Sequence, residues 1–525
     1  MRLARVTIPL LLLAPVAAQH PHPAPVSQAI GTVRFSTSCA APARPRFDRA
    51  VALLHSFTFA RATEEFNQVL RADPGCAMAW WGLAMTAWGN PFAAGVKPAV
   101  QIRRGLDAVT RARVTGAPTP RESRYIEAVA RLYERADSVD QRARLLSYRD
   151  AMAELVAAEP ADTEAAIFHA LALAISADPA DKSYASQLAA GATLERLFVA
   201  MPDHPGIAHY IIHSYDVPPL AGRALAAARR YSRIAPAVAH ALHMPSHTWT
   251  RVGYWQQSID ANVASAGAAR REGSTAEELH SGDYRTYAYL QLGKERAVRR
   301  ILDSLPAVAA RLDPNAVGSA APPAAGYFAI AAIPARYALE RGAWAEAARL
   351  EVRPSPVPFA DAVTWFARAL GSARSGDTAA ASAAVAALDG IHERLVRAHE
   401  AYWSDQIDIQ RQAAGAWLDL AAGRTDSALV RMRRAADHED ATEKNAITPG
   451  PLAPARELLG EMLLAAGRPA EARAAFETTL RHEPNRYRAL AGAAHAASAA
   501  GDRKAAARFH AQLLELRAHA DRPER

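Results

Sequence analysis

A spacing of 34 residues constrains the fold of this chain more than any other feature. His209 and His213 are followed by His243 and His247, and each member of the second pair lies 34 residues after its counterpart. That period is typical of tetratricopeptide repeats, in which two helices form one unit of a superhelical solenoid. Residues four apart on a helix share a face, so each histidine pair is predicted to project from one side of its helix.

Turn and breaker residues recur with the same period. Gly467 and Gly501 are 34 residues apart, as are Pro202 and Pro236. Thr119 to Glu122 reads as a capping box with proline at the first helical position, which predicts a helix start there. The sequence shows no strict alternation of apolar and polar residues of the kind that a half-buried strand requires. We therefore expect an all-α tetratricopeptide-repeat solenoid.

The N-terminal residues and one interior stretch rich in proline and small residues predict how the chain divides into segments. Arg2 and Arg5 precede an apolar run at 6–16 and small residues at 17–18, a pattern typical of a cleaved secretory signal. Prolines and small residues around 313–323 mark the strongest interior break. We predict a signal peptide at 1–18, a tail at 19–45, a repeat block at 46–312, a linker loop at 313–326 and a second repeat block at 327–525.

The predicted signal bears on location and on the two cysteines. We expect a periplasmic or secreted protein, and the apolar stretches are too short for a membrane span. In an oxidising compartment Cys39 and Cys76 could form one disulfide, and the alternative is two buried free thiols. The net charge of +8 arises from 61 basic and 53 acidic residues without a basic run, so no nucleic-acid partner is predicted.

Repeat register predicts where the histidines point. When Gly253 and Gly293 are aligned with the turn of a repeat, the histidines fall at positions of the first helix that line the concave groove. Solenoids of this kind use that surface for ligands. The predicted groove residues are His209, His213, His240, His243, His247, His280, Asp283 and Tyr287.

Four of these residues are candidate metal ligands. Imidazoles from neighbouring helices can meet on one ion at about 2.0–2.1 Å. His209, His213, His243 and His247 could thus hold zinc or copper, with Asp283 or Asp216 as an oxygen ligand or supporting group. The alternative is that the histidines hydrogen-bond to their neighbours and simply line a polar groove.

Two local features narrow the chemistry. Neither histidine pair has glutamate after its first member, so the general base of a His-Glu-x-x-His protease is absent. Pro245 lies between His243 and His247, where it removes a backbone donor from the helix and crowds the preceding turn. Sequences tend to break local rules at functional or strained sites, although a tolerated kink is the other interpretation.

Several sequence blocks resemble those of a known family. Residues 203–210 read Asp-His-Pro-Gly-Ile-Ala-His-Tyr, and 240–247 read His-Ala-Leu-His-Met-Pro-Ser-His. Together with the blocks at 37–39, 54–57, 76–82, 443–444 and 454–460, they are similar to a family of exported bacterial tetratricopeptide-repeat proteins. The resemblance covers nearly all of the chain after the signal. It implies the fold and no particular activity.

The sequence leaves two functions open. The leading hypothesis is an exported solenoid without enzymatic activity that binds a peptide or protein segment in its concave groove. The alternative is a metal-binding protein, possibly a hydrolase, whose zinc or copper ligands are His209, His213, His243 and His247.

Overall fold

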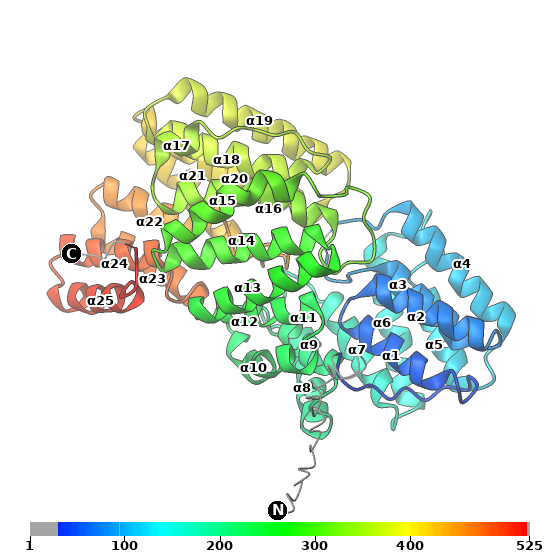
Figure 1. The fold of residues 1–525 in the computed structure, drawn as a ribbon. Helices are drawn as coiled ribbons and strands as arrows, with labels where there is room; N and C mark the ends of the chain where they lie inside the picture. The colour runs from blue at the N-terminus through cyan, green and yellow to red at the C-terminus, as the bar shows by residue number, and fades with distance from the viewer. Residues whose placement is uncertain (1–29, 94, 522–525) are drawn as a thin grey trace, which may run out of the picture.

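The chain folds into paired helices that stack side by side. The computed structural model describes residues 30–93 and 95–521, and these residues contain helices, turns and loops but no strand. Sequential helices contact each other along the whole array, as the pairs α22·α23 and α24·α25 do. Figure 1 shows the curved path from the N-terminal helices to the C-terminal ones. This arrangement is the predicted tetratricopeptide-type solenoid. The predicted signal peptide lies outside the described residues.

The first third of the array surrounds a large apolar core that contains Phe47, Trp81 and Tyr125. Its helices are α1 (Arg44–His55), α2 (Phe59–Ala72), α3 (Ala77–Trp88), α4 (Ala99–Thr115), α5 (Pro120–Ala130), α6 (Gln141–Ala158), α7 (Thr163–Ile175) and α8 (Ala185–Ala200). The predicted start of α5 is confirmed, because the Thr119 hydroxyl accepts a hydrogen bond from the Glu122 amide at 3.2 Å.

The middle third carries the histidines. Its elements are α9 (Pro205–Ser214), the 3₁₀ helix η2 (Ala221–Ala224), α10 (Leu225–Ile234), α11 (Ala239–His243), α12 (Pro245–Arg251), α13 (Trp255–Glu272), α14 (Thr275–Gln291), α15 (Glu295–Ala309) and α16 (Pro323–Glu340). The loop at 310–322 covers most of the predicted linker, and α16 begins within its last part. This loop is tied to the first block, since the Asn90 side chain donates to the Ala320 carbonyl at 2.9 Å.

The last third has a second large apolar core, to which Phe366, Trp403 and Phe476 belong. Its helices are α17 (Trp344–Ala348), α18 (Pro358–Arg374), α19 (Thr378–Arg397), α20 (Ala401–Ala421), α21 (Thr425–Asp440), α22 (Ala455–Ala465), α23 (Pro469–His482), α24 (Tyr487–Ala499) and α25 (Arg503–Leu516). The first core extends into the middle third, where Tyr210, Ala241 and Met244 belong to it and where many buried residues are polar.

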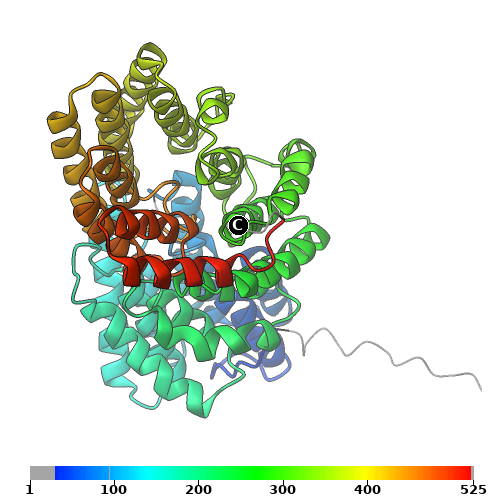
Figure 2. The same cartoon turned by 90° about the vertical axis from the view of Figure 1, so that its left-hand side faces the viewer.

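The superhelix curves until its C-terminal repeats contact its middle (Figure 2). The indole nitrogen of Trp255 donates to the Asn485 carbonyl at 2.8 Å. Gly253 has a φ of 71°, and a Cβ there would lie 2.2 Å from the Pro484 carbonyl oxygen. A side chain at this turn is therefore excluded by both backbone conformation and space. The contact fixes how tightly the solenoid closes around its concave face.

The N-terminal segment is tied to the first repeats. Cys39 and Cys76 form the expected disulfide, with their Cα atoms 4.8 Å apart. Ile30 and Phe35 are buried in the first core, and Ser38 donates to Glu122. The described part of the predicted tail is thus packed against the helices, because the disulfide and these contacts hold it there.

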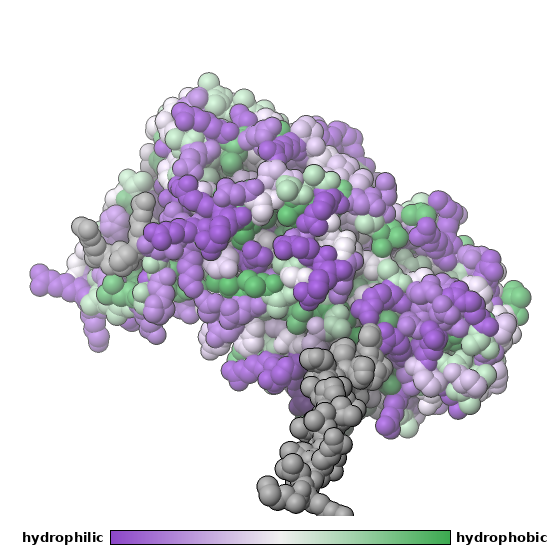
Figure 3. Space-filling view, in the orientation of Figure 1, coloured by the Kyte–Doolittle hydropathy of each residue, from purple (hydrophilic) through white to green (hydrophobic). Residues whose placement is uncertain are grey.

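The face of the molecule that Figure 3 shows has few large apolar areas. The face in Figure 3 is mostly hydrophilic, with hydrophobic residues in small scattered patches. Among the residues that the structure describes, no helix combines the length and the apolar character that crossing a membrane requires. The features that suggest a ligand lie inside the curve of the solenoid.

Candidate metal centre

Six buried histidines come together from three successive repeat helices. Helix α9 supplies two, the α11–α12 pair supplies three, and α14 supplies one. Met244 alone separates α11 from α12, so Pro245 does break the helix at the predicted point. None of the six is more than 8% exposed: His209, His213, His240, His243, His247 and His280.

The six divide into two groups of three. In each group, every histidine has one ring nitrogen that lies within 4.8 Å of a ring nitrogen of each of the other two. The first triad is His209, His213 and His240, and the second triad is His243, His247 and His280. The four predicted metal ligands are therefore divided between the two triads, two in each. The third histidine of each triad comes from the wider set of predicted groove residues.

The two triads are neighbours. The ring centroids of His213 and His247 are 5.9 Å apart, and those of His240 and His243 are 6.0 Å apart. These two contacts each join a residue of one triad to a residue of the other. The six rings form one continuous cluster.

Hydrogen bonds fix the protonation of two rings in the first triad. The Nδ1 atom of His209 donates to the main-chain carbonyl of His55 at 2.6 Å, and that of His240 lies 3.2 Å from a Glu277 carboxylate oxygen. Carbonyl and carboxylate oxygens accept hydrogen bonds, so each Nδ1 carries the proton and each Nε2 carries a lone pair. The Nε2 atoms of all three triad members are buried and have no hydrogen-bond partner.

The second triad shows the same arrangement. The Nδ1 atom of His243 donates to the Asn262 side-chain oxygen at 2.7 Å, and that of His247 donates to Asp216 at 2.9 Å. The Asn262 amide nitrogen donates to the Ser258 carbonyl, which fixes the orientation of the amide. The Nε2 atoms of His243 and His247 face each other at 3.0 Å, although neither holds a proton in these tautomers.

A proton between the two facing Nε2 atoms would stabilise this contact, but protonating these buried rings costs free energy. Burial is the main cause that lowers the pKa of His243 and His213 well below the usual range, and neighbouring histidines lower both further. Burial also lowers the pKa of His280 to about 3, and its Nδ1 has no hydrogen-bond partner. Buried lone pairs without a donor cost free energy. The cluster is therefore suited to a cation other than a proton.

Aromatic side chains enclose the cluster. Phe92 stacks on His213 with centroids 3.8 Å apart and an angle of 8° between the rings. Tyr284 packs against both His243 and His247, with centroid distances of 4.8 Å and 5.1 Å. These contacts restrict the rings to their present orientations.

The structure does not bring two of the predicted groove residues to the histidines. Asp283 is fully buried in an ion pair with Arg336 at 2.8 Å, because it leaves α14 on the side that faces α16. Tyr287 lies two turns beyond His280, about 10 Å along the helix axis. Its hydroxyl accepts from Arg486 at 2.9 Å.

Residues that the sequence analysis missed support the histidines. Asn262, Glu277 and Tyr284 have no repeated counterpart that could reveal them. Asp216, considered as a supporting group, does contact His247 and also accepts from Lys444 at 3.0 Å. Lys444 lies in the block at 443–444 that resembles the known family, and this resemblance was the sequence signal that could have indicated its role.

A segment of the chain crosses the concave face. Residues 441–454 join α21 to α22 without forming a helix. The Tyr284 hydroxyl donates to the Thr448 carbonyl at 3.2 Å, and Arg336 donates to the Gly450 carbonyl at 2.9 Å. Part of the surface on which a bound peptide would lie is therefore covered by the protein itself.

Another buried histidine cluster has a different character. Glu164 accepts from His55 Nε2 at 3.0 Å and from His204 Nε2 at 2.9 Å. The remaining nitrogens contact the Tyr210 hydroxyl and the Ile207 amide. Because every ring nitrogen has a partner, this cluster is explained by structure alone.

Comparisons with known proteins add little to this geometry. No family model matches the sequence, and no curated protein does. A human IFIT1 dimer with m7Gppp-AAAA is similar in structure at a TM-score of 0.36 and 10% identity, covering 79% of this chain and 86% of that one. The APC/C hetero-tetramer Cut9-Hcn1 gives a TM-score of 0.37 and 12% identity, covering 89% and 78%. Similarities this low carry no functional argument, and the family resemblance has no further support from them.

Proposed function

We propose that this chain is a metal-binding protein that holds two transition-metal ions, one in each histidine triad. The observation that carries the proposal is the set of three buried Nε2 atoms in the first triad that have no hydrogen-bond partner. Imidazole nitrogen suits zinc and copper. Ligands of calcium or magnesium would be oxygens, which the two triads lack.

The groups behind the histidines support the same proposal. Histidines that bind metal usually donate their other nitrogen to a carboxylate, a carbonyl or a similar acceptor, which fixes the ligating atom. His240 and His247 contact carboxylates, His209 contacts a carbonyl, and His243 contacts an amide oxygen. In four of the six rings, a hydrogen bond from Nδ1 to an oxygen acceptor thus leaves Nε2 free to bind a metal ion.

The number of ligands favours a reactive rather than a purely structural centre. Structural zinc sites are closed by four protein ligands, whereas catalytic sites have three and an open position. Each triad supplies three histidines. The proposal therefore includes an accessible coordination position on each ion.

Metal analysis of the purified protein tests the proposal. After dialysis without chelator, we expect about two ions of zinc or copper per chain, as in other two-metal sites. His240→Ala and His243→Ala should each lose at least half of the metal, while His169→Ala, a half-buried histidine of α7, should keep all of it. Metal far below one ion per chain, or equal content in all variants, would contradict the proposal.

Peptide binding in the groove stays a prediction. The segment at 441–454 crosses the concave face, and no contact among the described residues favours a peptide over a metal ion. Pull-down experiments with the His240→Ala variant would reveal whether partner binding depends on the same surface.

We also infer that the protein is exported. The Cys39–Cys76 disulfide suits an oxidising compartment, and residues 1–18 have the composition of a cleaved signal. Terminal sequencing of the mature protein should find a start close to residue 19. A mature chain that begins at Met1 would contradict export by this route.

A further inference from the structure

A cavity of about 280 Å³ lies directly against both triads. His213 and His240 of the first triad line it, as do His247 and His280 of the second. A molecule in this space would therefore lie beside two histidines of each triad. The size is informative, since a dry cavity of about 150 Å³ is enough for benzene.

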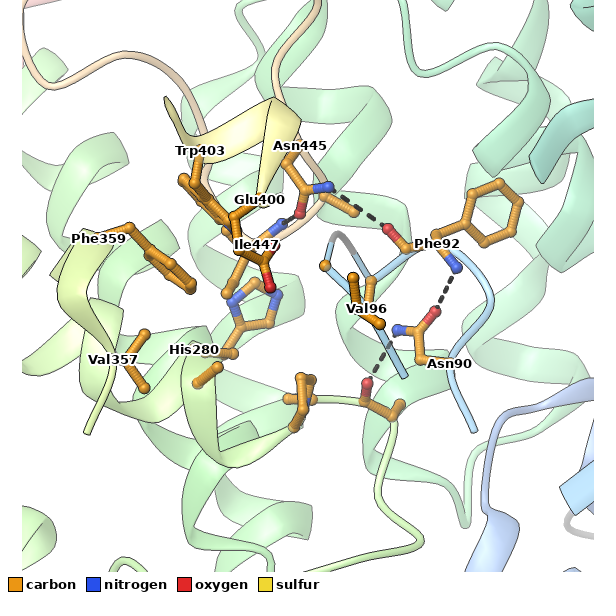
Figure 4. Close-up of a pocket in the computed structure, with 18 of the residues that line it drawn as sticks. Asn90, Phe92, Val96, His280, Val357, Phe359, Glu400, Trp403, Asn445 and Ile447 are labelled. Carbon is orange, nitrogen blue, oxygen red and sulfur yellow. Dashed lines mark hydrogen bonds between the residues drawn. The ribbon is translucent and has the colours of Figure 1, made fainter. Parts of the chain in front are cut away.

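The walls of the cavity are apolar and partly aromatic. Phe359 stacks on Trp403 with centroids 3.8 Å apart and 7° between the rings. Figure 4 shows Phe359, Trp403 and Ile447 near His280 on one side of the cavity, with Val96 across from them. Flat aromatic surfaces of this kind favour a ring that can stack on them or meet them edge to face.

The polar side chains in the walls are already used. Asn90 donates to the Ala320 carbonyl and accepts from the Phe92 amide, while Asn445 accepts from the Ile447 amide at 3.0 Å. Burial raises the pKa of Glu400, and a hydrogen bond from the Val96 amide opposes the rise. A ligand with several polar groups would leave them unpaired here, which costs free energy.

We propose that this cavity binds a small neutral aromatic molecule with one hydroxyl group, with the ring between the apolar walls and the oxygen toward the metal ions. The inference rests on the proposed metal centre, because the ions provide the polar partner that the walls lack. A single ring with small substituents fits the available volume. The apolar walls offer no partner to a charged group, which disfavours a ligand that carries a charge on its ring substituents.

Calorimetric titration with phenol tests the inference, with cyclohexanol as a non-aromatic probe of similar size. Metal-loaded wild type should bind phenol at least about tenfold more tightly than cyclohexanol, a difference of about 1.4 kcal/mol. Ala324→Phe adds a ring to the cavity wall without changing a histidine, and it should weaken phenol binding at least about tenfold. Ala383→Phe, on the exposed face of α19, is the matched control and should bind as wild type does.

The metal content of each sample separates the two proposals. If the protein holds metal but binds phenol no better than cyclohexanol, the aromatic ligand is wrong and the metal centre stands. Unchanged phenol binding in Ala324→Phe, or equal binding by the metal-free protein, would also overturn the inference. If the wild type retains no metal, the proposed function fails first and this inference fails with it.

Discussion

Two buried histidine clusters in this protein look alike by distance and differ in their hydrogen bonds. In both the Glu164 cluster and the two triads, the candidate ligand atoms lie within 4.8 Å of one another. In the Glu164 cluster, each nitrogen of His55 and His204 has a partner. In the first triad, all three Nε2 atoms have none. Proximity alone therefore does not distinguish the two clusters, whereas the hydrogen bonds of the ring nitrogens do.

The two clusters are also connected. His55 binds Glu164 through its ring and accepts from His209 through its main-chain carbonyl. The fully paired cluster thus holds one of the groups that orient the first triad. Under the proposed function, the Glu164 cluster has a structural role and the triads bind metal, and experiments can separate these two roles.

The largest expected effect is on folding. Glu164→Ala leaves two buried histidines without their acceptor and should lower the free energy of unfolding of the metal-free protein by about 3–5 kcal/mol. His213→Leu removes a nitrogen that has no partner and should change it by less than about 1 kcal/mol. Urea unfolding followed by circular dichroism measures both. Equal losses in the two variants would remove the proposed distinction between the clusters.

The pH dependence of stability should reveal the same carboxylate. Burial alone would raise the pKa of Glu164, but the charges and hydrogen bonds of His204 and His55 lower it from 4.5 to about 2. Folding therefore favours the ionised form, so its stabilisation is complete above the unfolded pKa and is lost as pH falls from 4.5 toward 2. The shift corresponds to about 3 kcal/mol.

Comparison of wild type with Glu164→Gln isolates this contribution. The difference in urea midpoint between the two metal-free proteins should be large at pH 6 and should shrink at pH 3. A difference that is independent of pH would mean that the ionised carboxylate is not what stabilises this cluster.

Metal should stabilise the protein through the triads alone. At a free concentration about 100 times its dissociation constant, an ion that binds only the folded state adds about 2.7 kcal/mol. Wild type and Glu164→Gln should both gain stability, His243→Leu should gain less, and the double variant His240→Leu/His243→Leu should gain none. Thermal unfolding with and without metal provides the measurement. A full gain in the double variant would place the binding site elsewhere.

The fold was predictable because it depends on a repeated pattern. The spacing of 34 residues and the recurring glycines and prolines gave the solenoid, and repeat register brought six histidines to one region. Each of these inferences uses many positions that carry the same information. The disulfide was also predictable from the sequence, since two cysteines allow only one pairing.

The division into triads was not predictable because it depends on the rotation of neighbouring helices. His240 and His280 complete the two triads, whereas Asp283, three residues after His280, faces Arg336 instead. A difference of one residue rotates a side chain by about 100° around the helix. An error of one residue in the predicted register can therefore assign a core residue to the ligand-facing side of the helix, or the reverse. Glu277 lies one turn before His280, but its contact with His240 depends on the packing of α14 against α11.

The smallest predicted effect concerns a residue that touches a histidine and not the metal. Asn262 is fully buried on α13 and accepts from His243 Nδ1 at 2.7 Å. Asn262→Leu keeps the approximate size of the side chain but removes the acceptor, so His243 is no longer held with Nε2 toward the second site. Loss of such a group usually weakens metal binding by about 10–100-fold.

Ser265→Ala provides a matched control for this substitution. Ser265 is also buried on α13 and accepts a hydrogen bond from the Ser281 hydroxyl at 3.0 Å, but that bond involves no triad histidine. Competition with a chromophoric chelator should show at least about tenfold weaker binding at one of two sites in Asn262→Leu, with the other site unchanged. In Ser265→Ala both sites should keep their affinity. Equal weakening in the two variants would indicate a general effect of packing on α13, and the orienting role assigned to Asn262 would then be wrong.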